Sequence, residues 1–133
     1  MIKRLVLFGI SGCIGFVVDV AILYLLMGFL GLYGARVISF ICAVYVTWSF
    51  NRLLTFKNYD SGMHQKSEFL AYLGLMLCGG AINYAIYASL VTCSDQVHEF
   101  PIIGVALGTS VSMFVNYASS SFLFSRREGF KRI

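Results

Sequence analysis

Residues Leu5–Leu30 read LVLFGISGCIGFVVDVAILYLLMGFL, and Asp19 is the one charged residue among them. An α-helix rises about 1.5 Å per residue, so a run of this length crosses the roughly 30 Å of hydrocarbon in a bilayer. Three further apolar runs follow at Val37–Phe56, Phe69–Val91 and Phe100–Phe124. The sequence therefore predicts an all-α polytopic membrane bundle of four transmembrane helices.

The overall composition agrees with a membrane protein. Of the 133 residues, 59% are hydrophobic and 12% are charged, and the mean hydropathy is +0.81. Soluble domains carry about 25% charged residues. Only short connections remain outside the four runs, so we expect a single transmembrane domain over residues 1–133. The net charge of +4 does not indicate nucleic-acid binding, because no soluble surface remains to carry a basic stripe.

The basic residues are distributed unevenly along the chain. Nine of the ten lie before the first run, near or after the end of the second, or after the fourth: Lys3, Arg4, Arg52, Lys57, Lys66, Arg126, Arg127, Lys131 and Arg132. The other connections hold only Arg36. Short loops rich in Lys and Arg stay in the cytoplasm, which predicts cytoplasmic termini and a cytoplasmic central loop. These charges also suit anionic phospholipid headgroups.

The two halves of the chain resemble each other. Gly15 and Asp19 recur as Gly79 and Asn83, 64 residues later. The second run carries small or polar residues at every fourth position, namely Ser39, Ala43, Thr47, Asn51 and Thr55. The fourth run repeats this 65 residues later, with Gly104, Gly108, Ser112, Asn116 and Ser120. The pattern predicts two parallel-repeat hairpins at about 4–56 and 68–124, because both begin and end on the same side of the membrane.

These ladders have a physical function in a membrane. Small residues let helix backbones approach closely, and Ser, Thr and Asn form hydrogen bonds across the contact. Asp19 lies in mid-helix, where a charged carboxylate costs about 2.5–3.5 kcal/mol. Two hypotheses follow for Asp19. It bonds to a nearby Asn, Ser or Thr and fixes helix packing, or it takes part in transport as a proton acceptor or hydroxyl binder.

Arg36 and Arg52 lie at opposite ends of the second run. Their sixteen-residue spacing corresponds to roughly 24 Å along a helix. Arginine binds phosphate oxygens in a bidentate manner, so a phosphate crossing the membrane would meet one guanidinium at each end. The alternative is that both side chains reach to the nearest headgroups. Lys57 is interpreted as a plain topology charge. Trp48 is either an anchor at the membrane interface, the favoured interpretation, or a face on which a sugar stacks.

Several motifs resemble the GtrA-like family of small four-helix bacterial membrane proteins. They are Arg4–Gly9 leading to Gly15 and Asp19, then Ala35-Arg36, the segment Phe50–Phe56 (FNRLLTF), and Phe69, Tyr72, Gly79 and Asn83. The fourth run departs from the family, with Ser119–Ser121 where a basic residue is common. The resemblance implies translocation of a polyprenyl-phosphate-linked sugar, such as an undecaprenyl-phosphate sugar, to the outer leaflet of the bacterial cytoplasmic membrane. There, separate glycosyltransferases decorate O-antigen or other surface polysaccharides.

The resemblance also implies roles for individual residues. It implies that Arg36 and Arg52 bind the substrate phosphate. It also implies that four further residues either bind the sugar hydroxyls or form the helix contacts that shape the path, namely Asp19, Asn51, Asn83 and Asn116. Four helices leave little room for a path through one subunit, so we expect a homo-oligomer, most simply a dimer.

The sequence favours transport over catalysis. We expect no cofactor and no metal, because the four Cys and two His residues show no ligand spacing. We expect no enzymatic activity, because no nucleophile–base pair is present. Two other functions stay open. One is a proton-coupled small multidrug exporter with Asp19 as its binding site, although the charge bias and Arg36 argue against it. The other is an accessory subunit that scaffolds a membrane glycosyltransferase.

Overall fold

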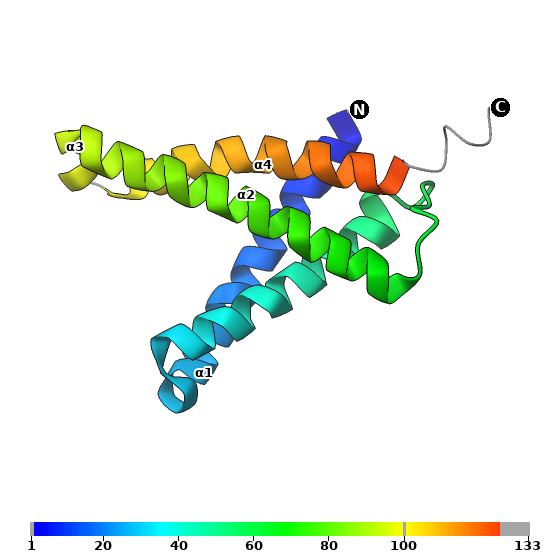
Figure 1. Cartoon of the computed structure of the whole chain (residues 1–133), viewed down its shortest axis with the longest axis horizontal. Helices are drawn as coiled ribbons and strands as arrows, with labels where there is room; N and C mark the ends of the chain where they lie inside the picture. The colour runs from blue at the N-terminus through cyan, green and yellow to red at the C-terminus, as the bar shows by residue number, and fades with distance from the viewer. Residues whose placement is uncertain (1, 100, 126–133) are drawn as a thin grey trace. The chain divides into compact units, whose positions relative to one another are not determined.

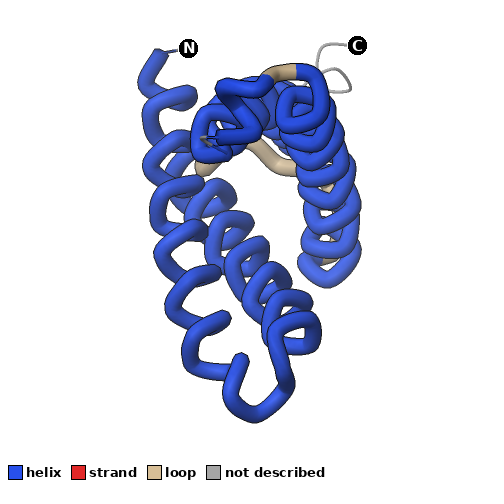
Figure 2. Tube along the Cα trace, turned by 90° about the vertical axis from the view of Figure 1, so that its left-hand side faces the viewer, coloured by secondary structure: helices blue, strands red, loops and turns tan. Residues whose placement is uncertain are grey.

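The chain is described from a computed structural model that covers residues 2–99 and 101–125, without the side chains of residues 32, 33, 36, 87, 91, 98, 101, 102, 105, 106 and 125. All regular structure in these ranges is helical (Figure 2). The elements are α1 (Ile2–Phe50), a π-helical segment η1 (Asn51–Thr55), α2 (Gln65–Cys93), α3 (Asp95–Glu99) and α4 (Pro101–Ser125). The all-α prediction is confirmed.

Three segments among the described residues are long and apolar enough to cross a membrane. They are Ile2–Gly31, Val37–Thr55 and Gln65–Leu90. They confirm a membrane protein of several spanning helices. The helix α4 has 25 residues, and its role as a fourth span stays a prediction.

The helix α1 consists of two arms that fold back on each other (Figure 1). Its one non-helical residue is Gly31, with φ 70° and ψ 172°. L-residues rarely adopt this conformation, whereas glycine does so at little steric cost. The chain reversal between the first two predicted runs is confined to this residue. We call residues 2–30 the first arm and residues 32–50 the second arm.

The observed helix boundaries differ from the predicted ones in three places. The second arm ends in the π-helical η1 rather than in regular α-helix, with the Phe56 N–H donating to the Asn51 carbonyl at 2.7 Å. The helix α2 begins at Gln65, four residues before the predicted start, and α3 occupies the third connection. The first residue of α4 is Pro101, since proline is tolerated where a helix N–H has no partner. The predicted start at Phe100 and the basic residues after Ser125 lie outside the described part of the chain.

The described residues form two compact units. The first comprises residues 2–73 and 123–125, and therefore contains both arms of α1, η1 and the start of α2. The second comprises most of residues 74–122, which include the rest of α2, all of α3 and most of α4.

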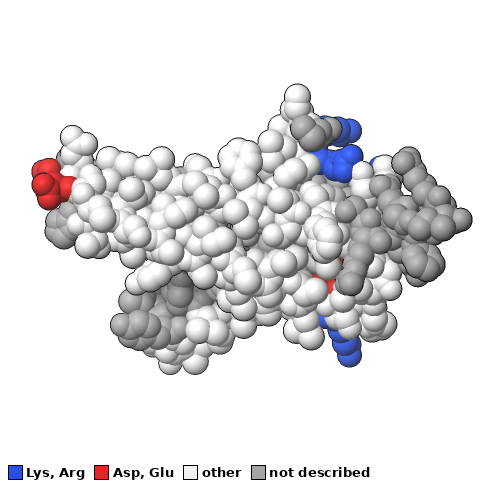
Figure 3. All heavy atoms as spheres, turned by 45° about the horizontal axis from the view of Figure 1, so that its top comes forward, with Lys and Arg blue, Asp and Glu red and all other residues white. Residues whose placement is uncertain are grey.

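The outer surface of the helices is apolar. Large hydrophobic side chains are exposed along both arms of α1, among them Phe16, Leu25, Phe29, Val37 and Tyr45. Uncharged residues cover most of the described surface that is visible in Figure 3. Such a surface suits lipid rather than water, because hydrocarbon tails solvate apolar side chains without a hydrophobic penalty.

Candidate functional site

Buried polar side chains join the two arms of α1. The Ser39 hydroxyl donates to Asp19 Oδ1 at 2.6 Å, and the side chains are 0% and 9% exposed. Nearer the N-terminus, the Ser11 hydroxyl donates to the backbone carbonyl of Thr47 at 3.3 Å. Asp19 therefore faces the opposite arm rather than lipid, and it accepts from a hydroxyl, one of the neighbours that the sequence suggested.

The arms cross closely at Gly15. A Cβ atom placed on Gly15 would overlap the Thr47 methyl group. The Thr47 hydroxyl donates to the Val44 carbonyl at 3.0 Å, which holds the methyl group toward the first arm. The glycine in the predicted repeat is therefore required by close backbone approach, as expected for small residues at membrane helix contacts.

The second unit contains an equivalent contact between α2 and α4. A Cβ atom on Gly79 would overlap the Asn116 amide, and one on Gly108 would lie 2.5 Å from Asn83 Oδ1 and 2.9 Å from the Asn83 carbonyl oxygen. The Asn83 amide also donates to the Thr109 hydroxyl at 3.4 Å. Asn83 and Asn116, both singled out from the sequence, therefore lie at the helix–helix contact of this unit.

The two repeats do not pack in the same register. In the sequence repeat, Gly15 and Thr47 correspond to Gly79 and Ser112. Gly79 nevertheless faces Asn116, which is one helical turn beyond Ser112. A helix face with a small or polar residue on every turn permits either register, because successive turns present similar surfaces to the partner helix.

Asn51 lies in a buried cluster at the end of the second arm. Its amide nitrogen donates to the Tyr72 hydroxyl at 2.9 Å, and its amide oxygen accepts from the Thr55 hydroxyl at 2.8 Å. Asn51 and Tyr72 are each 1% exposed. Beside them, the rings of Phe56 and Phe124 stack with centroids 4.9 Å apart. Asn51 thus ties η1 to the start of α2.

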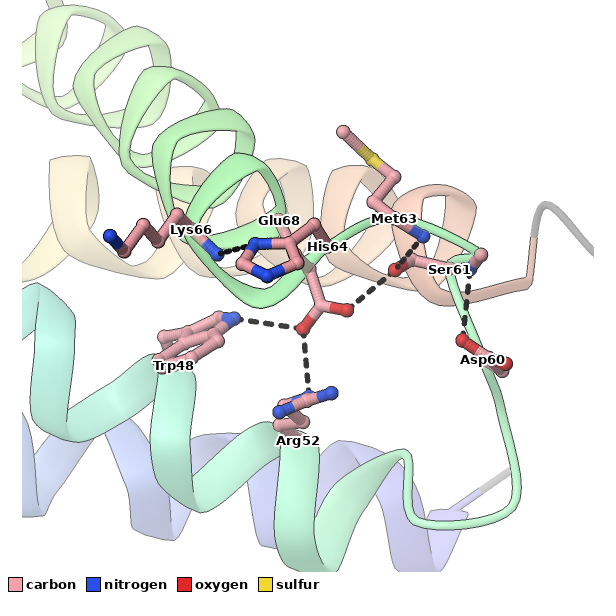
Figure 4. A network of polar contacts seen from close by, with 9 residues as sticks. Trp48, Arg52, Asp60, Ser61, Met63, His64, Lys66 and Glu68 are labelled. Atoms are coloured by element: carbon pink, nitrogen blue, oxygen red, sulfur yellow. Dashed lines mark hydrogen bonds and ion pairs between the residues drawn. The ribbon is translucent and has the colours of Figure 1, made fainter.

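A carboxylate next to this cluster collects three donors (Figure 4). Glu68, at the start of α2, is 2% exposed. It accepts from Trp48 Nε1 at 3.0 Å and from the Ser61 hydroxyl, and it pairs with Arg52 Nε at 3.1 Å. The Arg52 guanidinium also lies 5.6 Å from the Trp48 ring centroid. Trp48, interpreted from the sequence as an interface anchor, is instead buried.

The loop that brings Ser61 to Glu68 has a defined turn. The Gly62 N–H donates to Asp60 Oδ1 at 2.9 Å, and the Met63 N–H donates to the Ser61 hydroxyl at 3.3 Å. Gly62 has φ 72°, a region that favours glycine. Sequence reasoning placed Glu68 in a polar linker and missed this role. The available signal was that Arg52 and Glu68 flank the same connection, on the same side of the apolar runs.

A pocket of about 500 Å³ lies at the end of the α1 hairpin away from Gly31. Its lining combines residues of the first arm, η1 and the following loop: Lys3, Arg4, Leu7, Leu54, Thr55, Lys57, Asn58 and Tyr59. Of the described residues that line it, three are cationic and none is acidic. The Arg4 guanidinium carbon lies 4.7 Å from the Tyr59 ring centroid. Lys57, interpreted as a plain topology charge, therefore contributes to a pocket.

The predicted site residues divide between the two units. Asp19, Asn51 and Arg52 lie in the first unit. Asn83 and Asn116 lie in the second. The backbone of Arg36 lies in the second arm, while its side chain is outside the described residues. Among the described residues, no group of three His, Cys, Asp or Glu side chains could hold a metal ion.

Comparison with known proteins identifies one family. The family model described as "GtrA/DPMS, transmembrane domain" matches residues 7–124, which is most of the chain. Searches of curated proteins and of solved structures give no match. The family match agrees with the resemblance carried by the FNRLLTF segment and the Gly15–Asp19 pair. The chain therefore belongs to the GtrA/DPMS transmembrane-domain family.

Proposed function

We propose that the protein moves a polyprenyl-phosphate-linked sugar from the inner to the outer leaflet of the bacterial cytoplasmic membrane. Family membership supports a role in processes that involve polyprenyl-phosphate sugars. The proposed orientation has both termini in the cytoplasm, as the distribution of basic residues predicts. Cell-surface polysaccharides, such as O-antigen, would receive the sugar from separate glycosyltransferases, and the protein itself would catalyse no chemical step.

The observation that carries this proposal is the position of Arg52. Its side chain is 33% exposed, and its ion pair with Glu68 runs through Nε. A guanidinium has five N–H donors, four of them on the two terminal nitrogens. Those nitrogens can therefore bind two phosphate oxygens side by side without breaking the Nε contact. Glu68 would hold the guanidinium in place for this exchange.

The polar ladder of α1 suits the sugar that follows the phosphate. Arg36 is sixteen residues from Arg52, or roughly 24 Å along the second arm. Between these ends lie the Asp19–Ser39 hydrogen bond and the buried Asn51. A sugar hydroxyl without a hydrogen-bond partner in hydrocarbon costs several kcal/mol. Asp19 and Ser39 could give up their mutual hydrogen bond and bond to a sugar hydroxyl instead, which would reduce this cost.

Four helices leave little room for a path through one subunit, so we propose a homo-oligomer, most simply a dimer, as the transporting form. Two copies related by a two-fold axis would provide both walls of a path. Anionic phospholipids would surround the basic end of each copy and hold it at the cytoplasmic leaflet.

The proposal is tested by transfer of a labelled polyprenyl-phosphate sugar across proteoliposomes. We expect Arg36→Gln and Arg52→Gln each to slow transfer by about 10- to 100-fold, the worth of a hydrogen bond to a charged group. The matched control is Lys66→Gln, which removes an exposed basic residue in the first turn of α2 and should leave transfer unchanged.

Three outcomes would contradict the proposal. Unchanged transfer in both arginine variants would reject the phosphate roles. Transfer only in the presence of a glycosyltransferase would favour an accessory subunit. Resistance to quaternary ammonium compounds on expression, lost in Asp19→Asn, would favour a proton-coupled exporter.

A further inference from the structure

We propose that the basic pocket at the end of the α1 hairpin binds the phosphate of a membrane lipid. Resting on the proposed function, this lipid is the polyprenyl-phosphate sugar in the cytoplasmic leaflet, held before it reaches Arg52. The pocket volume of about 500 Å³ lies within the range of about 300–1,000 Å³ that is usual for small-molecule sites.

The charges of the pocket favour an anion. Lys3 and Arg4 come from the first turns of the first arm, and Lys57 comes from just beyond η1. Folding of the hairpin thus brings cations from distant positions in the sequence to one cavity, and none of the described residues that line it carries a carboxylate. Like charges repel one another, and a bound anion adds an attraction to each cation that offsets this repulsion.

The guanidinium of Arg4 is held in place before any ligand arrives. It lies over the Tyr59 ring at 4.7 Å, a cation–π contact. Tyr59 is fixed in turn, because its N–H donates to the Phe56 carbonyl at 2.9 Å and its ring meets the Phe56 ring edge-on at 6.2 Å. Phe56 is 1% exposed. A planar fork that is already oriented loses little entropy when it binds phosphate.

The pocket is only partly polar, which indicates a lipid rather than a free ion. Leu7 and Leu54 line it together with the cations. Leu54 is 50% exposed on the outer surface of η1, where a chain in the bilayer can reach it. A phosphate ester with an apolar tail would contact both the cations and the leucine side chains. Inorganic phosphate would contact the cations alone.

The pocket is connected to the polar ladder of the hairpin. Thr55 lines the pocket, and its hydroxyl donates to Asn51 Oδ1 at 2.8 Å. Asn51 is adjacent to Arg52 in η1. A lipid phosphate in the pocket would therefore lie next to the segment that carries the proposed transfer residues, and Leu54 would guide its chain along the same turn.

The test measures equilibrium binding of radiolabelled farnesyl phosphate to the full-length protein in phosphatidylcholine nanodiscs. Farnesol, which lacks the phosphate, is the matched ligand. We expect Arg4→Gln and Lys57→Gln each to weaken farnesyl phosphate binding by about 10- to 100-fold. Lys66→Gln removes the same charge outside the pocket and should not change binding. Arg4→Lys keeps the charge without the planar fork and should give an intermediate loss.

Farnesol binding as tight as that of farnesyl phosphate, or equal loss in Lys66→Gln, would overturn the proposal. So would unchanged binding in both pocket variants, provided that their melting temperatures match the wild type. Phosphatidylglycerol in the nanodiscs separates two sources of the phosphate. If it displaces farnesyl phosphate at equal mole fraction, the pocket binds phospholipid and the substrate assignment is overturned. If it does not, the polyprenyl phosphate is supported.

The pocket and the proposed function can fail separately. Wild-type protein that binds farnesyl phosphate through Arg4 and Lys57 but transfers no lipid-linked sugar would refute the function and keep the phosphate site. Protein that transfers the sugar while both pocket variants bind normally would refute the pocket alone.

Discussion

The Arg52–Glu68 ion pair offers a quantitative test of the architecture around η1. The distance between Arg52 Nε and Glu68 Oε1 is 3.1 Å. At this distance, the attraction between two opposite unit charges is about 5 kcal/mol at an effective dielectric constant of 20 and about 1.3 kcal/mol at 80. Glu68 is 2% exposed, whereas Arg52 is 33% exposed and partly screened by its surroundings. We therefore expect a coupling free energy of about 1–3 kcal/mol between the two side chains.

The single substitutions should differ in a defined order. Glu68→Ala removes the acceptor of the buried Trp48 N–H as well as the partner of Arg52, and an orphaned buried donor costs about 1–3 kcal/mol. Arg52→Ala leaves Glu68 with its two other donors, Trp48 and Ser61. We therefore expect Glu68→Ala to reduce the free energy of unfolding by more than Arg52→Ala does.

The assay is a double-mutant cycle in mild detergent, with unfolding driven by sodium dodecyl sulfate. Trp48 is the one tryptophan of the chain, so its fluorescence reports directly on this network. The four proteins are the wild type, Arg52→Ala, Glu68→Ala and the double variant, and the non-additive part is the coupling free energy. A coupling below about 0.5 kcal/mol, or equal losses in the two single variants, would refute the buried-network interpretation.

Two further predictions concern the helix contacts. Gly108→Ala should lower stability by about 1–3 kcal/mol, because the new methyl group meets the Asn83 backbone, whereas Gly80→Ala has open space and should be neutral; equal heat stability of the two variants in detergent would contradict this. Ser39→Ala should destabilise the α1 hairpin by about 0.5–1.5 kcal/mol, since it removes the hydroxyl that donates to the buried Asp19 carboxylate. Asp19→Asn keeps the acceptor oxygen and should cost less in the same unfolding assay.

The helical architecture was predictable because it depends on local properties of the sequence. Long apolar runs define the spanning segments, and Gly31 and Pro101 mark a turn and a helix start through their own backbone preferences. The ladder residues were predictable as helix contacts for a similar reason, since their four-residue spacing places them on one face. The π-helical η1 had no such signal, because its residues fit an α-helix equally well.

The contacts that depend on tertiary register were not predictable. Lys57 lines the same pocket as Arg4 only because the two arms of α1 pack in one particular axial register. Gly15 permits this register, but Gly15 alone does not specify it. The one-turn shift between the two repeats shows the same limit. Hydrophobic and small-residue patterns determine which helix faces pack together. The side chains one turn above and below each contact decide at which axial position the two helices pack.

In the proposed transport cycle, the buried carboxylate of Glu68 would also act on the bound phosphate. A phosphate bound to Arg52 would lie close to Glu68, since the two side chains already touch at 3.1 Å. The repulsion between the two anions would offset part of the attraction to the guanidinium. Permeation requires a site that is favourable enough to enter and weak enough to leave. In the proposed cycle, Glu68 thus keeps Arg52 oriented when the site is empty and promotes release of the phosphate once it has bound.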